Sequence, residues 1–397
     1  MFQCLKRLVY QVPDLGEASR WYSKILGKQP DYESPFGVIF NVGDNSLSLV
    51  PGNVPFPDDN GRMSVYWEVE DVDAAYQQLI AAGAKPHTEL QNVHMIRIAK
   101  VFDPFGNVLG LTGKIPNTTD QTVESQPSRT AVGVALCRTL ATYDERPELK
   151  GPDYLAKLFL TMEGQLPLKN ASLRAKFISE FITTRRYGYM IARTAFIDRL
   201  FQQAIQEGTP QIVFLGAGYD TRTHRYPELP ENITVFELDV PTTQNRKKEI
   251  LQKANVATPP QLRYVSINFK NDSLKECLCR AGFDITAKTF FIWEGVTYYL
   301  DAGAIDATLQ FVHDHTPTGS SICFDYMIAK MESVVVSEPY IFWLEKEKLD
   351  PFLAQRGFQA REHLDAAAIE HRFLTLPDGT IAEGTMPHFH LVHAVTV

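Results

Sequence analysis

The chain has 397 residues, of which 44% are hydrophobic and 22% are charged, and its formal net charge at pH 7 is −8. This length predicts two or more domains, and the composition is that of a globular protein with enough apolar material for a sizeable core. The acidic balance, without any run of Lys and Arg, excludes a basic nucleic-acid-binding surface, and no apolar stretch is long enough to predict a membrane span.

Residues 1–114 show the same order of predicted elements twice. The first set is a strand at 8–12, a helix at 17–26 and strands at 38–42 and 47–50; the second is a strand at 64–69, a helix at 71–82 and strands at 95–101 and 108–111. Gly27 and Gly83, which end the two helices, lie 56 positions apart. This period predicts a duplicated β-α-β-β-β unit.

The duplicated unit resembles the glyoxalase/bleomycin-resistance (vicinal oxygen chelate) family over residues 1–113. The motifs that carry the resemblance are Trp21-Tyr-Ser-Lys-Ile-Leu-Gly27 and Asp103-Pro-Phe-Gly-Asn-Val-Leu-Gly110. Enzymes of that family bind a divalent metal through His, Gln and Glu, but the corresponding positions here hold Arg7, Ser64 and Gly110, and residues 47–51 offer no carboxylate. We therefore expect a metal-free domain. It either binds a small molecule or is a purely structural or dimerising module, which would make the chain a homodimer in the second case. The structural interpretation is favoured because no pocket residue stands out.

Residues 115–127 are polar, contain Pro116 and Pro127, and lack periodicity, which predicts an interdomain linker. The sequence then becomes helical, with a helix capped by Ser128 that runs to residue 141, another near 153, and one or two helices over 172–206. Arg185, Arg186 and Arg193 lie in the last stretch. A single Arg on a helix is by default a solvent-exposed residue.

From residue 210 onward, apolar strands alternate with helices. Strands are expected at 212–215, 234–238, 262–267, 289–293 and 320–326, followed by a mostly helical segment at 331–369 that could cover a cleft and by a final antiparallel strand within 383–397. This order predicts an α/β domain at 128–397 with a doubly wound parallel sheet. In such sheets ligands bind outside the carboxyl ends of the strands.

The residues that follow these strands suggest a nucleoside site. The first strand runs into Gly216-Ala-Gly218, where the absence of side chains lets the backbone approach a ligand. Glu237 and Asp239, at the end of the second strand, are placed to accept hydrogen bonds from a ribose. A dinucleotide site requires a third glycine where this chain has Thr221, and Asp220 would repel a pyrophosphate. A nucleoside with a zwitterionic amino-acid tail fits better, because Asp220 could face an ammonium group and an Arg could face a carboxylate.

Residues 128–397 resemble the S-adenosylmethionine-dependent methyltransferases of the leucine carboxyl methyltransferase family, which includes protein-C-terminus carboxyl methyltransferases and bacterial polyketide O-methyltransferases. The matching motifs, in the order of the family, are Ser-Arg-Thr-Ala-Val (128–132), Ala-Arg-Thr-Ala-Phe-Ile-Asp (192–198), Leu-Gly-Ala-Gly-Tyr-Asp-Thr-Arg (215–222), Phe-Glu-Leu-Asp-Val-Pro (236–241) and Trp-Glu-Gly-Val-Thr-Tyr-Tyr-Leu (293–300). The resemblance implies a Rossmann-like class I methyltransferase sheet with a helical lead-in and a lid. It also implies S-adenosyl-L-methionine as cofactor and S-adenosyl-L-homocysteine as product.

The same resemblance implies roles for individual residues. Arg193 pairs with the methionine carboxylate, Gly216 and Gly218 let the cofactor lie against the backbone, Asp239 binds the ribose, Asn268 and Phe269 flank the adenine, and Glu294 completes the site. Asn268 stands where many relatives have Asp, and since Asn can still accept from and donate to an adenine edge, we expect cofactor binding to survive at reduced strength. Tyr299 is a candidate substrate contact, with core packing as an equal alternative.

The acceptor is less well specified by the sequence. The strand-end motifs contain no His–Asp pair or other clear general base, which favours an acceptor that is already acidic, a carboxylate or an acidic hydroxyl. His388 and His390 share a face of the last strand but have no third ligand nearby in sequence, so no metal site is expected.

Together these observations predict an S-adenosyl-L-methionine-dependent O-methyltransferase that acts on a small polyketide or other secondary metabolite. The alternatives are a protein carboxyl methyltransferase and a non-catalytic small-molecule-binding protein that keeps both folds. The chain start lacks the apolar core of a secretory signal, and the five cysteines are scattered and odd in number, which predicts a cytoplasmic protein with reduced thiols. No nucleic-acid or membrane partner is expected.

Overall fold

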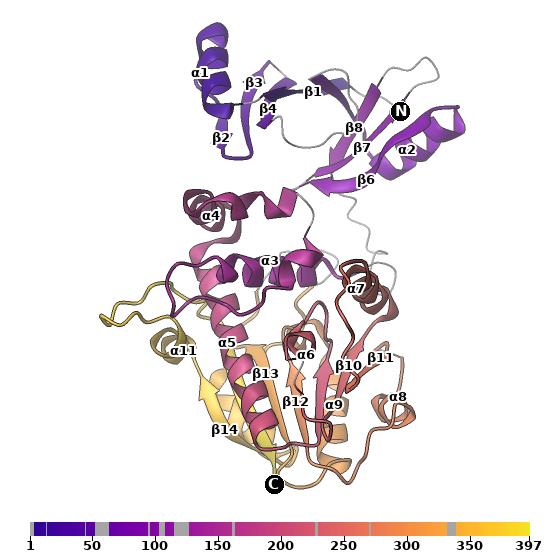
Figure 1. The fold of residues 1–397 in the computed structure, drawn as a ribbon, viewed down its shortest axis with the longest axis vertical. Helices are drawn as coiled ribbons and strands as arrows, with labels where there is room; N and C mark the ends of the chain where they lie inside the picture. The colour runs from indigo at the N-terminus through magenta and orange to yellow at the C-terminus, as the bar shows by residue number, and fades with distance from the viewer. Residues whose placement is uncertain are drawn as a thin grey trace. The chain divides into compact units, whose positions relative to one another are not determined.

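The structure is a computed structural model that describes residues 4–12, 14–43, 45–51, 63–93, 96–102, 108–114, 127–160, 163–226, 229–269, 271–331 and 339–397. The chain divides into two compact units, residues 1–118 and residues 119–397, and Figure 1 labels many of their helices and strands. Apart from Pro127, the expected linker lies outside the described residues. Its boundaries therefore stay a prediction.

The first unit contains an eight-stranded sheet and two helices. Its elements are β1 (Cys4–Val12), α1 (Leu15–Leu26), β2 (Tyr32–Ser34), β3 (Gly37–Val42), β4 (Asn45–Pro51), β5 (Met63–Glu68), α2 (Val72–Ala81), β6 (Lys85–Val93), β7 (Ile96–Phe102) and β8 (Val108–Lys114). The strand order β2-β3-β4-β1-β5-β8-β7-β6 places two copies of the same four-stranded set edge to edge, joined by antiparallel β1 and β5. The predicted duplication is confirmed, although the sequence reasoning missed β2 and β6.

The two helices of this unit lie where the sequence predicts, although α1 begins two residues earlier than expected and α2 is one residue shorter at each end. The side chain of Asp14 accepts a hydrogen bond from the backbone N–H of Glu17 at 2.7 Å, and Asp71 accepts one from Ala74 at 3.0 Å. These are N-cap interactions, which satisfy N–H groups that the first helical turn leaves unpaired. Gly27 ends α1 with φ of 64°, a left-handed conformation that glycine adopts without strain.

The second unit contains a seven-stranded sheet of order β11-β10-β9-β12-β13-β15-β14. Its elements are α3 (Arg129–Thr142), η1 (Ala156–Phe159), η2 (Glu163–Lys169), α4 (Ala171–Phe177), η3 (Ile178–Ile182), α5 (Thr184–Gln206), β9 (Gln211–Leu215), α6 (Arg222–Arg225), β10 (Thr234–Asp239), α7 (Pro241–Lys253), β11 (Leu262–Ser266), α8 (Leu274–Arg280), β12 (Thr289–Trp293), η4 (Thr297–Tyr299), α9 (Ala302–Asp314), β13 (Ser321–Met327), η5 (Lys346–Lys348), α10 (Leu349–Ala354), β14 (Phe358–Leu364), α11 (Ala366–Phe373) and β15 (Phe389–Thr396). The five strands from β11 to β13 are parallel, and β15 runs antiparallel to both neighbours.

One expectation for this unit is wrong in part. Residues 331–369 were expected to be mostly helical, but the described part of this segment includes β14, the edge strand of the sheet. The strand was hidden in the sequence because only Phe358 and Leu364, at its two ends, are buried, while Gln359 is exposed and the remaining residues are half-buried or exposed. An edge strand of this kind lacks a clear apolar pattern.

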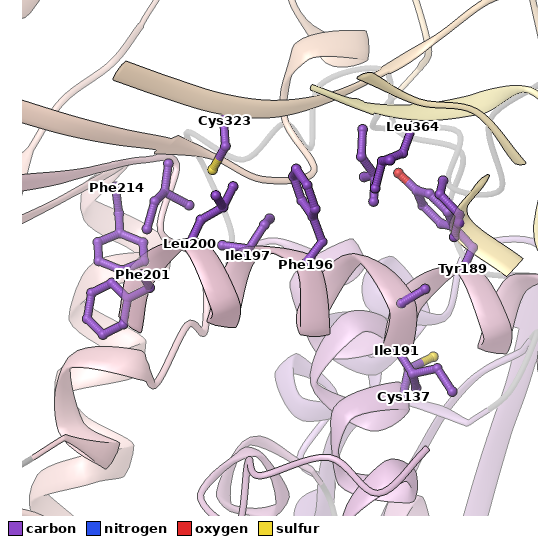
Figure 2. Close-up of a cluster of buried hydrophobic side chains, with 14 of the residues drawn as sticks. Cys137, Tyr189, Ile191, Phe196, Ile197, Leu200, Phe201, Phe214, Cys323 and Leu364 are labelled. Atoms are coloured by element: carbon purple, nitrogen blue, oxygen red, sulfur yellow. The ribbon is translucent and has the colours of Figure 1, made fainter. Parts of the chain in front are cut away.

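Helix α5 fixes the position of the later site residue Arg193. Its apolar face, which includes Phe196, Ile197 and Leu200, packs on the sheet, and Figure 2 shows these side chains pointing toward Cys323 and Phe214. Burying each large apolar side chain contributes roughly 1.5–3 kcal/mol, so the helix is held firmly against the strands. No helix among the described residues is long and apolar enough to cross a membrane.

Candidate functional site

A cavity of about 480 Å³ lies at the carboxyl ends of the parallel strands of the second unit. Its wall includes the predicted site residues Arg193, Gly216, Gly218, Asp220, Asp239, Asn268, Phe269, Glu294 and Tyr299. These residues come from α5, from the last residue of β10 and from the segments that follow β9, β11 and β12. The structure therefore brings together all but one of the residues that the sequence singled out.

The exception is Glu237, which is absent from the cavity wall. It lies two residues before the end of β10, and its buried carboxylate accepts hydrogen bonds from Lys247 Nζ at 2.6 Å and Thr223 Oγ1 at 3.1 Å. These partners belong to α7 and α6, which cover that part of the strand. Glu237 is engaged in a buried ion pair away from the cavity.

The glycine turn after β9 forms part of the cavity wall with its backbone. Gly216 has φ of 77°, and a Cβ atom at this position would lie only 2.7 Å from Cγ2 of Val296. Gly218 also has positive φ, at 50°. Any side chain at Gly216 would therefore be strained and would collide with the wall.

Asp239 is fixed beside this turn. Its Oδ2 accepts a hydrogen bond from Gly218 N at 2.5 Å, and its Oδ1 accepts one from Val240 N at 2.7 Å. Burial raises the pKa of Asp239 to about 6, and the two backbone donors oppose that shift. Because the carboxylate also lines the cavity, its remaining lone pairs can accept from ligand hydroxyl groups.

Arg193 is buried, with 1% of its surface exposed, so the default interpretation as a solvent-exposed helix residue is wrong for this position. Its Nε donates to Glu294 Oε1 at 3.1 Å, and its Nη1 donates to Asp325 Oδ2 at 2.8 Å and to the Tyr298 hydroxyl at 3.2 Å. Burial alone would lower the pKa of Arg193, but the carboxylates of Asp325 and Glu294 raise it well above its usual value. The guanidinium is therefore a permanent cation in the cavity wall.

Arg222 is a second buried guanidinium beside the cavity. It donates from Nε to Asp198 Oδ1 at 2.5 Å and from Nη1 to Glu294 Oε2 at 2.7 Å, and it also pairs with Asp220. Burial would raise the pKa of Asp220, but Arg222 overrides that effect and the pKa is about 2. The sequence reasoning placed Asp220 opposite a ligand ammonium group, and in the structure its carboxylate already has Arg222 as a partner.

The sequence reasoning missed several residues of this region. Asp325 is fully buried within β13, and Arg138 of α3 lines the cavity while forming an ion pair with Asp153 at 3.1 Å. A detectable signal existed for Asp325, because a charged residue inside the apolar run of β13 requires a buried cation as partner. Arg138 had no comparable signal, since its helix is separated from the sheet by a long stretch of chain.

A further part of the cavity wall is apolar and aromatic. It includes Val296, Tyr299, Leu300, Pro339 and Ile341. The Tyr299 ring packs against Tyr298 and Tyr340, with ring centroids 4.8 Å and 5.3 Å apart. Tyr299 therefore packs in an aromatic cluster and lines the cavity at the same time.

The expectation that His388 and His390 share a face of the last strand is wrong, because β15 begins at Phe389 and His388 lies outside it. His390 Nδ1 lies 3.0 Å from Nε2 of His363 on β14, and burial lowers the pKa of His390 to about 4. His388 has no part in this pair. Within the ranges that the structure describes, no group of three or more His, Cys, Asp and Glu residues is arranged to hold a metal ion.

The metal-ligand positions of the first unit are also occupied by unsuitable groups. A Cβ at Gly110 would lie 2.6 Å from the carbonyl oxygen of Val65 and 2.7 Å from the Tyr66 ring, so a longer side chain has no room there. The Nε of Arg7 donates to Ser46 Oγ at 3.3 Å. The side chain of Ser64 lies outside the described residues. The first two observations support a domain that does not use these positions for a metal.

Comparison with known families agrees with this division of the chain. Residues 131–313 match the model of the leucine carboxyl methyltransferase family, and residues 5–111 match that of the glyoxalase/bleomycin resistance protein/dioxygenase superfamily. A glycopeptide N-methyltransferase structure, MtfA, shares 14% identity over 51% of this chain and 95% of its own, with a TM-score of 0.35. A structural likeness of this size carries no argument about function.

Closer sequence relatives are provisionally named S-adenosyl-L-methionine-dependent methyltransferases. YktD of Bacillus subtilis is 30% identical over 221 residues, which cover 52% of this chain and 71% of YktD. A relative from Mycobacteroides abscessus is 30% identical over 253 residues, which cover 59% of this chain and 82% of that protein. Some other relatives are covered less completely, for example 37% of one from Mycolicibacterium paratuberculosis. The chain belongs to the S-adenosyl-L-methionine-dependent methyltransferases, and its residues 131–313 match the leucine carboxyl methyltransferase model within that group.

Proposed function

We propose that this methyltransferase transfers a methyl group to an oxygen of a small metabolite, such as a polyketide or another secondary metabolite. The observation that carries the proposal is the two-part wall of the cavity. One part holds the residues expected to bind the cofactor, and a second part is the uncharged set of Val296, Tyr299, Leu300, Pro339 and Ile341. The second part suits the carbon skeleton of an acceptor better than a highly charged peptide.

The residues present fit S-adenosyl-L-methionine. Gly216 and Gly218 expose backbone to the cavity, Asp239 offers acceptors for the ribose hydroxyl groups, and Asn268 and Phe269 lie in the wall where the adenine is expected. In Arg193, Nε and Nη1 are engaged by protein groups, which leaves Nη2 to receive the ligand carboxylate. When bound, the cofactor supplies an electrophilic methyl group on a sulfonium and leaves as S-adenosyl-L-homocysteine.

The titratable groups of the cavity favour an acidic acceptor. No histidine lines the described part of the wall, and the carboxylates of Asp220 and Glu294 are held by arginines that lower their pKa, against the opposing effect of burial. Such carboxylates are weak bases. Both oxygens of Asp239 already accept backbone hydrogen bonds. The protein thus has little means to deprotonate an ordinary alcohol, whereas a carboxylate or an acidic hydroxyl is ionised in advance.

The test is a comparison of acceptors with the purified full chain and isotopically methyl-labelled cofactor. The panel contains carboxylic acids, acidic phenols, simple alcohols and amines of matched carbon skeleton, and products are identified by the mass gained when the labelled methyl group replaces a proton. We expect methylated products from the carboxylic acids or the acidic phenols. Esters formed from the carboxylic acids should be hydrolysed by mild alkali. Methylation confined to amines would contradict the proposal, and methylation confined to simple alcohols would contradict the preference for an acidic acceptor. Cofactor binding without any product would instead support a binding protein.

A further inference from the structure

A continuous chain of buried ion pairs lies beside the cofactor cavity. It joins Arg138 to Asp153 (3.1 Å), Asp153 to Arg225 (3.7 Å), Arg225 to Asp198 (3.2 Å), Asp198 to Arg222 (2.5 Å), Arg222 to Asp220 and Glu294, Glu294 to Arg193 (3.1 Å) and Arg193 to Asp325 (2.8 Å). No side chain in this chain of ion pairs, called here the charge network, is more than 9% exposed.

The charges of this network do not cancel. It contains four guanidinium groups and five carboxylates, which leaves one negative charge in excess. Arginine stays protonated in proteins, and Arg222 and Arg193 lower the pKa of Glu294 despite its burial, so the excess persists at neutral pH. An unbalanced buried charge is costly because water does not solvate it. A bound cation would relieve that cost.

The cofactor and its product differ by one unit of charge. S-adenosyl-L-methionine carries a sulfonium and an ammonium group against one carboxylate, so its net charge is +1. S-adenosyl-L-homocysteine has an uncharged thioether in place of the sulfonium, so its net charge is zero. A fixed negative charge in a poorly solvated region therefore stabilises the first ligand more than the second.

We propose that the excess negative charge of the network makes the site selective for S-adenosyl-L-methionine over S-adenosyl-L-homocysteine. The selectivity rests on the cofactor site described above. It acts through the summed charge of the network and needs no direct contact between the ligand and each acid. Once the methyl group has been transferred, the ligand loses its positive charge and this part of its affinity, which favours product release.

Asp198 offers a way to change the charge without touching the ligand. Its carboxylate pairs with Arg222 and Arg225, and it is not part of the cavity wall. Asp198→Asn is nearly isosteric and removes the excess charge. At an effective dielectric constant of about 20, one unit charge acting over roughly 12 Å changes a binding constant about tenfold. We expect the Kd for S-adenosyl-L-methionine to rise roughly fivefold to tenfold, while the Kd for S-adenosyl-L-homocysteine stays within about twofold.

The matched control restores the net charge. In the double variant Asp198→Asn/Arg225→Gln, one acid and one base are removed together, so the excess negative charge returns. The ratio of the two dissociation constants should then return toward that of the wild type, even if both affinities fall. Sinefungin, which carries a protonated amine in place of the sulfonium, should follow S-adenosyl-L-methionine in every variant.

The measurement is isothermal titration calorimetry of the full chain with the three ligands, after thermal melting has shown that each variant is folded. Asp153→Asn makes the same charge change at the other end of the network and replaces Asp198→Asn if that variant does not fold. The selectivity proposal is overturned if the ratio of the Kd for S-adenosyl-L-homocysteine to the Kd for S-adenosyl-L-methionine is unchanged in a folded single variant. It is also overturned if the double variant has the same ratio as the single variant. Failure of the wild type to bind any of the ligands would instead overturn the cofactor site itself.

Discussion

Asp325 and Arg193 are joined by a hydrogen bond of 2.8 Å between Oδ2 and Nη1, and both side chains are almost completely buried. The same carboxylate accepts hydrogen bonds from the backbone N–H of Gly295 at 2.6 Å and from the Tyr189 hydroxyl at 2.7 Å. Asp325 thus connects helix α5 with the turn that follows β12. One side chain of the sheet holds the two segments that flank the cavity.

Removal of this carboxylate should strongly destabilise the second unit. Asp325→Ala leaves Arg193 with less compensation and the N–H of Gly295 unpaired, and the loss of one member of a buried ion pair costs about 3–5 kcal/mol. The free energy of unfolding, measured by urea denaturation with circular dichroism, should fall by about this amount. Asp314→Ala on the exposed surface of α9 is the control, and it should leave the free energy of unfolding almost unchanged. A loss below about 1 kcal/mol for Asp325→Ala would contradict the interpretation of Asp325 as a structural link.

Substitution of two glycines with similar backbone conformations can separate the cost of backbone strain from the cost of a steric clash. Gly216 has φ of 77° and would place a Cβ 2.7 Å from Val296, whereas Gly208 has φ of 68° and no atom within 4 Å of the added Cβ. Gly208→Ala should therefore cost about 1 kcal/mol through backbone strain alone. Gly216→Ala should cost at least about 1 kcal/mol more and should weaken cofactor binding, because Val296 must move within the cavity wall.

Denaturation and calorimetry on both variants check this prediction. Equal losses of stability in the two variants, with unchanged cofactor affinity, would show that Val296 yields to the added methyl group at little cost. The cavity wall at the glycine turn would then deform more easily than the distance between the added Cβ and Val296 indicates.

Most of the fold follows from local patterns in the sequence. The duplicated β-α-β-β-β unit was visible because Asp14 and Asp71 cap helices that Gly27 and Gly83 terminate. The parallel strands of the second unit were visible because they are apolar throughout, as β9 and β12 are. Edge strands such as β14 were missed, because half of their surface faces water and their pattern does not differ from that of a loop.

The site was less predictable than the fold. Residues that end strands could be placed in a common cavity, since the ends of parallel strands lie at one edge of a sheet. Glu237 was misplaced by this argument, because two residues of strand are enough to move a carboxylate from the edge into a buried ion pair with Lys247. The charge network depends on pairs such as Arg222 with Asp198 and Arg193 with Asp325, which lie 24 and 132 positions apart, and local spacing does not reveal them.

The apolar part of the cavity wall should determine the acceptor. Ile341 lines the cavity and is 48% exposed, so Ile341→Ala should affect the fold little and reduce contact with the acceptor. We expect kcat/KM for the acceptor to fall about tenfold, which corresponds to roughly 1.4 kcal/mol of lost apolar contact, with the Kd of S-adenosyl-L-methionine unchanged. Ile285→Ala is the matched control, because Ile285 is 45% exposed and lies outside the wall. If the two variants lower kcat/KM by the same factor, the acceptor does not bind against Ile341.

The titration of Asp239 should affect cofactor affinity and folding stability in opposite directions. As the pH rises, its contribution to stability is lost while the affinity for the cofactor increases. Burial raises its pKa from 3.8 to about 6. A carboxyl group with a raised pKa in the folded state contributes stability that is complete below pH 3.8 and lost as the pH rises through 6. Hydrogen bonds from a ribose require the ionised form, so affinity for S-adenosyl-L-methionine should be full above pH 6 and weaken as the pH falls below that value.

Calorimetry between about pH 5 and pH 8, with parallel urea denaturation, tests both signs in the wild type. Asp220 remains ionised throughout because its pKa is about 2, so it adds no slope in this range. The matched variant is Asp239→Asn, which should bind the cofactor more weakly at neutral pH and lack the slope below pH 6. A slope that persists in Asp239→Asn would assign the titration to another group. Affinity in the wild type that is independent of pH would show that the ribose does not depend on the Asp239 carboxylate.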